Sequence, residues 1–235
     1  MTKFLLFISL LMSSTCYCQQ VSLVDFDDVK KKTVDSNSVY FYPQLKKKIL
    51  KADASITAED YHYLYYGFVF QPNYVPSGTS NQKKKFTELY LEKKYKEALV
   101  VGEKEIKRNP VDLDLLLKMS ISCLEMGKDS LKRKYATLYY SILDVIYNSG
   151  DGKDLGSAYV VISVNHEYQI LNDLGLKAIS QQLITDCDLL NFRKRDQDKV
   201  KGRKKIKRLF FNVRMPLLSL SKSFKDVDLP DPDED

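Results

Sequence analysis

The stretch LYLEKKYKEA at residues 89–98 is followed, 34 residues later, by CLEMGKDSLK at residues 123–132. Around the first copy, apolar or small residues recur with the period of one face of an α-helix, at Tyr95, Ala98, Leu99, Gly102 and Ile106. A fixed spacing of helical patterns is the mark of stacked helical hairpins. We therefore expect antiparallel helix pairs in the middle of the chain.

A 34-residue period is that of the tetratricopeptide repeat. Tyr95, Ala98 and Pro110 lie near the positions where that pattern has an aromatic residue, an alanine and a proline. The second copy lacks the closing proline. The sequence thus predicts about one and a half tetratricopeptide-like repeats, with an unrelated antiparallel helix bundle as the alternative.

An aromatic-rich helix is expected ahead of the repeats. Thr57 and Asp60 have the spacing of a capping box at its start. Two apolar stripes follow, the first at Tyr61, Leu64, Tyr65 and Phe68 and the second at Tyr63, Tyr66 and Phe70. A helix that is apolar on two sides packs between neighbours. We assign residues 39–148 to one helical, tetratricopeptide-like region.

The pattern changes after residue 148. A turn cluster at residues 149–152 leads into an apolar run at 158–164, which predicts a buried strand. A short helix is expected at 166–174, and alternating residues at 179–189 and 209–215 predict two more strands. Residues 149–225 therefore form a small α+β unit with an antiparallel sheet. The fold class is α+β, mainly α.

The N-terminal residues resemble a cleaved secretory signal peptide. Lys3 precedes a short apolar run, and Cys16 and Cys18 place small side chains before a cut ahead of Gln19. Residues 1–18 are thus predicted to be removed, and 19–38 form a lead-in segment. This predicts a periplasmic or secreted protein with no transmembrane span, the alternative being a lipoprotein anchor at Cys16 or Cys18.

Charge is unevenly placed on a chain of net charge +6. Residues 193–208 hold ten Lys or Arg and two Asp, and we predict that the acidic tail at 226–235 is disordered. An anion-binding surface would use Arg193, Lys194, Arg195, Arg203, Lys204 and Lys205. For an exported protein its partner would be anionic lipid or glycan, not nucleic acid. The alternative is a solvated hairpin tip.

The sequence lacks the motifs of common hydrolases, zinc proteases and nucleotide-binding proteins. Of its two histidines, His62 lies on the aromatic helix and His166 stands beside Glu167. Catalysis would require one of them in a cleft with an acidic neighbour, and simple packing is the alternative. We predict no metal and no cofactor. Cys123 and Cys187 are expected to be buried free thiols, or else one disulfide.

Seven Tyr and Phe residues crowd into residues 61–74. Tyrosine combines a flat apolar face with a hydroxyl, which suits glycans, peptides and partner helices. Tyr63, Tyr66 and Tyr74 are the candidate binding residues. Plain core packing between helices is the alternative.

Several stretches resemble one family. They are Tyr65–Gly67 with Phe70, Gln71 and Tyr74, the turn at 149–152 before Ala158, the pair Glu167–Tyr168, and Phe211–Val213. The chain is similar to the exported proteins of Bacteroidetes-type bacteria grouped as domain of unknown function 4919. The resemblance covers nearly all of the mature chain and implies an envelope or secreted location without implying an activity.

The sequence favours a non-enzymatic protein- or peptide-interaction module of the cell envelope, because stacked helical hairpins offer a concave binding face. An envelope hydrolase without a familiar motif is the second hypothesis. A binder of anionic lipid or glycan, acting through the basic segment, is the third.

Overall fold

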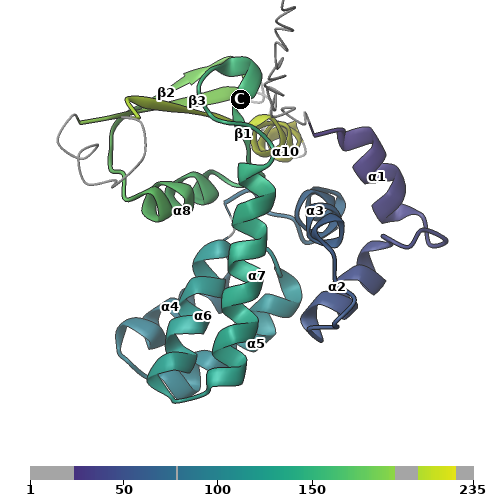
Figure 1. The fold of residues 1–235 in the computed structure, drawn as a ribbon, viewed down its shortest axis with the longest axis vertical. Coiled ribbons are helices and arrows are strands. Elements are labelled where there is room, and N and C mark those ends of the chain that lie inside the picture. Colours follow the sequence, from purple (N-terminus) through teal and green to yellow (C-terminus); the bar gives the residue numbers. More distant parts are fainter. Residues whose placement is uncertain (1–23, 78, 194–205, 226–235) are drawn as a thin grey trace, which may run out of the picture.

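The computed structural model describes residues 24–77, 79–193 and 206–225. Two helical hairpins form one end of the molecule, and a small sheet with α8 and α10 forms the other (Figure 1). The helices are α1 (Phe26–Val34), α2 (Tyr42–Leu50), α3 (Ala58–Gly67), α4 (Asn81–Leu91), α5 (Tyr95–Arg108), α6 (Leu113–Glu125), α7 (Asp129–Tyr147), α8 (Val164–Leu174) and α10 (Arg214–Lys225). The strands are β1 (Tyr159–Val160), β2 (Ala178–Ile184), β3 (Cys187–Phe192) and β4 (Arg208–Asn212). The prediction of a mainly helical α+β protein is confirmed.

The hairpins α4–α5 and α6–α7 carry the predicted repeat. Lys94 N–H donates to Leu89 O at 2.9 Å at the end of α4, and Lys128 N–H donates to Cys123 O at 2.8 Å at the end of α6. Each bond closes around a left-handed residue, Lys93 (φ 58°) in the first hairpin and Gly127 (φ 64°) in the second. Both hairpins therefore turn with the same helix-ending geometry, 34 residues apart.

Helix α3 lies between α1 and α2 on one side and α7 on the other (Figure 1). Its start is fixed by the predicted capping box, in which Thr57 and Asp60 each accept a bond from the other's backbone N–H. A side chain at Gly67 would come within 2.6 Å of Thr33 Cγ2, so glycine lets α1 approach. The aromatic helix is thus packed on two sides, as its two stripes predict.

The four strands of the described residues form one mixed sheet in the order β1-β4-β3-β2. Strands β2, β3 and β4 pair antiparallel, whereas β1 joins β4 in parallel. The expectation of a wholly antiparallel sheet is wrong at β1, because the chain reaches β1 directly from α7 and crosses back to β4 much later.

Two predicted strands have different bounds in the structure. The apolar run at 158–164 gives only the two residues of β1, since Ser163 caps α8 by accepting a hydrogen bond from Asn165 N–H. The alternation at 179–189 is broken by a turn, at which Thr185 takes a left-handed conformation (φ 56°), so two paired strands replace one. Periodicity alone did not reveal either boundary.

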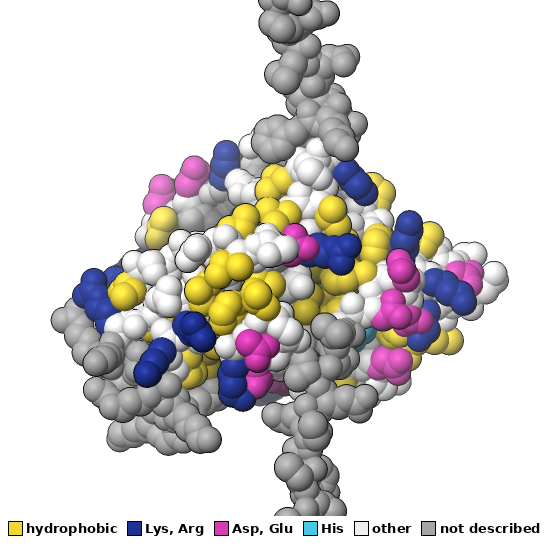
Figure 2. Space-filling view, turned by 90° about the horizontal axis from the view of Figure 1, so that it is seen from above, with side chains coloured by type: hydrophobic (Ala, Val, Ile, Leu, Met, Phe, Trp, Pro, Cys, Tyr) yellow, Lys and Arg dark blue, Asp and Glu magenta, His cyan; other side chains and the backbone are white. Residues whose placement is uncertain are grey.

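One hydrophobic cluster runs from Val29 on α1 through the repeat helices to Val213 after β4. The sheet and the helical hairpins therefore share a core. Figure 2 views the sheet end, where hydrophobic side chains gather in the middle of the face with charged side chains around them. Within the described part of the chain, no helix has the length and apolar character of a membrane span.

Candidate functional site

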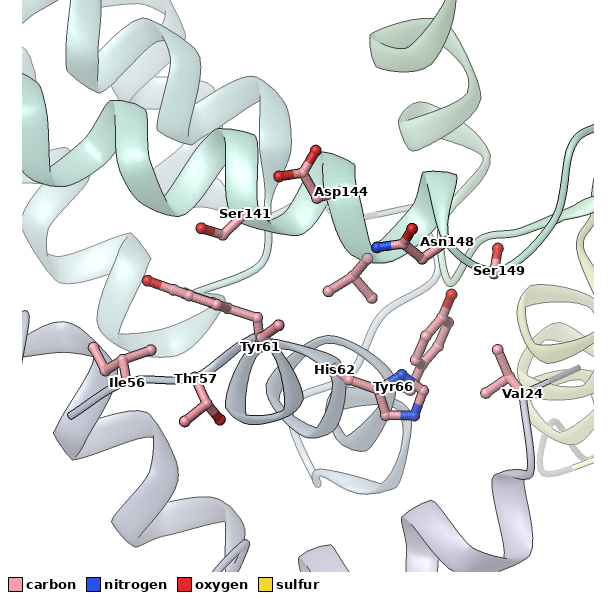
Figure 3. Close-up of a pocket in the computed structure, with 12 residues that line it drawn as sticks. Val24, Ile56, Thr57, Tyr61, His62, Tyr66, Ser141, Asp144, Asn148 and Ser149 are labelled. Carbon is pink, nitrogen blue, oxygen red and sulfur yellow. The ribbon is translucent and has the colours of Figure 1, made fainter. Parts of the chain in front are cut away.

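A cleft of about 360 Å³ opens between α3 and α7 (Figure 3). Tyr61, His62 and Tyr66 project from α3, and the facing wall carries Ser141, Asp144 and Asn148 from α7. Val24, Ile56, Thr57, Ala58, Val145 and Ser149 complete the lining. The volume suits a small molecule or a few residues of a peptide.

The α3 wall is aromatic and uncharged. The ring of His62 meets the ring of Tyr66 edge-on, with the centroids 4.9 Å apart. Burial lowers the pKa of His62 below its usual value near 6.5, so the imidazole is neutral at pH 7. The Tyr66 ring is fully buried, and its hydroxyl donates to Val160 O at 3.2 Å. The partly exposed rings of Tyr61 and His62 are the part of this wall that a ligand can contact.

The α7 wall is polar and acidic. Asp144 is exposed, and among the described residues no Lys or Arg pairs with its carboxylate. The last turn of α7 also holds no basic residue, although the negative end of the helix dipole lies there. This end of the cleft therefore favours a cation.

A second compartment of about 340 Å³ adjoins the first across Tyr61, which lines both. Its described charged lining residues are Lys51, Arg133 and Lys134, with no Asp or Glu among them. None of the three cations forms an ion pair with a described carboxylate. We call the two compartments together the α7 groove, which is basic near the start of α7 and acidic near its end.

Another depression, of about 490 Å³, lies among α4, α6 and α8. Helix α8 packs against α6. Lys83, which lines the depression, is held by Asp112 with Nζ and Oδ2 2.6 Å apart. One of its two lining lysines is thus already paired, whereas none of the three cations of the α7 groove is paired with a described carboxylate, and we take the groove as the candidate site.

The three tyrosines predicted to bind a partner have internal hydrogen bonds. Tyr63 is 4% exposed and accepts from Lys32 Nζ at 2.6 Å while donating to Asp28 at 2.7 Å, which ties α3 to α1. Tyr74 Oη donates to Ile162 O at 2.7 Å. Tyr66 alone of the three lines the α7 groove.

His166 and Glu167 are neighbours in sequence, but the structure does not bring them together in one cleft. His166 Nδ1 lies 2.8 Å from Tyr65 Oη, and burial lowers its pKa to about 3. Tyr65 Oη also accepts from Ile162 N–H at 3.3 Å, so this hydroxyl joins the imidazole to the backbone ahead of α8. His166 is a neutral packing residue.

Glu167 is fully buried, and its carboxyl group has the Asp188 carboxyl as its side-chain hydrogen-bonding neighbour. Burial raises the pKa of Glu167 to about 9, and the nearby Asp188 carboxyl on β3 is the second cause of this rise. Asp188 itself accepts from Gln181 Nε2 at 2.7 Å. Glu167 is therefore a protonated acid between α8 and the sheet at pH 7.

The remaining predicted sites lie partly or wholly outside the described residues. Of the proposed anion-binding surface, only Arg193 is described, and it is exposed; Lys194, Arg195, Arg203, Lys204 and Lys205 fall outside. Residues 1–18, predicted to be a signal peptide, and the acidic tail at 226–235 also fall outside. Cys123 and Cys187 are buried free thiols. Within the residues described, no group of three or more His, Cys, Asp or Glu could hold a metal ion.

Sequence reasoning missed the charged residues of the α7 groove. Arg133, Lys134 and Asp144 belong to one continuous helical pattern and look like ordinary surface charges. The signal that could have drawn attention to Asp144 is an acidic residue in the last turn of a long helix without a basic residue. The contribution of Lys51 and Tyr61 requires the tertiary structure.

Comparison with curated proteins and with solved structures gave no significant match. A family model does match, and it covers residues 27–222. The family is described as Domain of unknown function (DUF4919). Because the match spans most of its length, from α1 to α10, this chain belongs to that family.

Proposed function

We propose that this protein is a non-enzymatic protein- or peptide-interaction module of the cell envelope, and that a partner segment lies in the α7 groove. The observation that carries the proposal is the groove itself, two clefts that share Tyr61, with charges at either end that form no ion pair with a described residue. Tyrosine faces and unpaired charges are the features that peptide-binding surfaces use for anchoring and orientation.

The absence of assembled catalytic geometry favours binding over hydrolysis. His62 lines the groove, but among the described residues no hydrogen bond joins it to a hydroxyl or a carboxylate. A general base needs a proton within reach and a group that orients the ring. Figure 3 shows His62 and Asp144 on opposite walls. The hydrolase alternative rests on His62 sharing the cleft with Asp144, with no hydrogen bond between the two.

The envelope location rests on the signal-like residues 1–18. Fractionation of expressing cells should place the mature chain outside the cytoplasm, with Gln19 as its first residue. Labelling by a fatty-acid probe at Cys16 or Cys18 would instead support the lipoprotein anchor. An uncleaved chain in the cytoplasmic fraction would contradict the location.

Binding is tested by retaining partners from envelope extract on the mature protein and identifying them by mass spectrometry. Ser141→Trp should fill the first compartment and abolish specific retention, and Thr137→Trp should do the same in the second. Tyr140→Trp is the matched control, because Tyr140 is 56% exposed on α7 and lines neither compartment.

The decisive result is a partner retained by wild type and Tyr140→Trp but lost by both groove variants. Thermal unfolding of each variant shows whether its fold is intact. A partner retained equally by all folded variants would show that the α7 groove is not the binding site.

A further inference from the structure

The two ends of the α7 groove carry opposite, unpaired charge. Arg133 and Lys134, together with Lys51, line the compartment near the start of α7, and Asp144 lines the compartment near its end. Among the residues that the structure describes, no Lys or Arg lines the acidic compartment and no Asp or Glu lines the basic one. A ligand that spans the groove meets this polarity along its length.

The dipole of α7 does not explain why an acidic residue stands near the C-terminal end of this helix. A helix is stabilised by acidic residues in its first turn and basic residues in its last turn. The last turn of α7 has no basic residue, and Asp144 stands close to that end. A cation placed against Asp144 and the last carbonyl groups would relieve this unfavourable arrangement. His62 is neutral at pH 7 because burial lowers its pKa, so it does not repel such a cation.

The spacing of the charges sets the length of the ligand. Arg133 and Asp144 are both on α7, and at about 1.5 Å per helical residue they lie about 16 Å apart along the axis. An extended peptide covers about 3.3 Å per residue, so about five of its residues bridge that distance. Tyr61, which both compartments share, lies between the two ends and offers its ring to an intervening side chain.

We propose that the α7 groove selects an extended peptide that presents a carboxylate to Lys51, Arg133 and Lys134 and, about five residues away, a Lys or Arg side chain to Asp144. This rests on the proposed function, because it names the class of segment that the groove takes. The carboxylate belongs to an Asp or Glu side chain or to the terminus of the peptide. Peptides with a free and with an amidated terminus distinguish these sources.

A random dodecapeptide display library selected on the mature protein tests the proposal. The library is counter-selected on Ser141→Trp, so that only groove-dependent binders remain. The enriched sequences should carry an acidic position and a basic position about five residues apart. The best peptide is then synthesised, and its Kd is measured by fluorescence anisotropy.

Charge reversal gives the second readout. The double variant Arg133→Glu, Lys134→Glu should raise the Kd about tenfold, and replacing the acid of the peptide with Lys should restore binding to that variant. Asp144→Lys should likewise raise the Kd, and replacing the basic residue of the peptide with Glu should restore binding to that variant. The control Lys104→Glu, Lys107→Glu reverses two exposed charges on α5, outside the groove, and should leave the Kd unchanged.

The outcomes separate the two levels of the proposal. Groove-dependent peptides without the charge pair, or a Kd insensitive to the α7 reversals, would overturn the selectivity while leaving peptide binding intact. A selection that enriches nothing over Ser141→Trp would overturn peptide binding and the selectivity with it.

Discussion

Glu167 shows how burial changes what a residue does. From the sequence it was a candidate acid beside His166, but the structure encloses it between α8 and β3 with a pKa raised to about 9. The unfolded chain would release the proton near the usual value of 4.5. Between these values the folded state holds a proton that the unfolded state has lost. The contribution of Glu167 to the free energy of unfolding is therefore complete below pH 4.5, and it is lost as the pH rises toward about 9.

Glu167→Gln makes this pH dependence measurable, because glutamine has nearly the same size and shape as glutamate but no ionisable group. Between pH 6.5 and 8, the free energy of unfolding of wild type should fall relative to that of the variant by about 1.4 kcal/mol per pH unit. The unfolded chain titrates His166 near pH 6.5, at the lower edge of this window, but wild type and variant share that contribution, so the comparison between them removes it. Urea denaturation at several pH values measures the effect.

Glu97→Gln on α5 is the matched control, because it removes an exposed carboxyl and should follow wild type. Parallel pH profiles for wild type and Glu167→Gln would show that the buried carboxyl is not protonated at neutral pH.

At the scale of elements, the two hairpin turns allow a paired test. Lys93 and Gly127 occupy equivalent left-handed positions, but only glycine takes that conformation without a steric cost. Lys93→Gly should raise the free energy of unfolding by about 0.5–1 kcal/mol, and Gly127→Lys should lower it by about 1 kcal/mol. Chemical denaturation measures both, and effects of the same sign would contradict the equivalence of the turns.

The turn at 149–152 allows a second paired test. A side chain at Gly150 would come within 2.6 Å of the Ala158 carbonyl oxygen, whereas at Gly156 the nearest atom is Asp154 Oδ1 at 3.5 Å. Gly150→Ala should therefore lower the free energy of unfolding by about 2 kcal/mol or more and reduce the melting temperature, whereas Gly156→Ala should change both little. Equal melting temperatures would mean that the backbone does not pass so close to Gly150.

The helical elements were more predictable than the strands. The start of α3, the second hairpin turn at Gly127 and the end of α8 at Gly175 each have a local signal in the sequence, namely a capping box or a left-handed glycine. The division of 179–189 into β2 and β3 has none, because Thr185 carries no glycine-like signal for its left-handed turn. The α7 groove was unpredictable for a further reason: its walls come from segments as far apart as Lys51 and Ser149.

Across the whole molecule, tyrosine hydroxyls join the helices to the sheet region. Tyr65, Tyr66 and Tyr74 bond to the segment between Val160 and His166. Since the hydrophobic core also crosses this boundary, the helical and α+β parts should unfold together. During unfolding, far-ultraviolet and near-ultraviolet circular dichroism should report one coincident transition. Tyr66→Phe should lower the free energy of unfolding obtained from each signal by about 1 kcal/mol. Two separated transitions would show that the parts are independent.

Helix α3 has a consequence for how this architecture can vary. It packs along α7, on the flank where a further hairpin would otherwise stack. Open helical arrays lengthen by duplicating their unit, because each new hairpin finds a free neighbour. Here a helix from earlier in the chain occupies that place, so duplication of the second hairpin would displace α3 and expose its aromatic faces. Diversification within such a scaffold is thus confined to exchanging side chains on a surface of constant size.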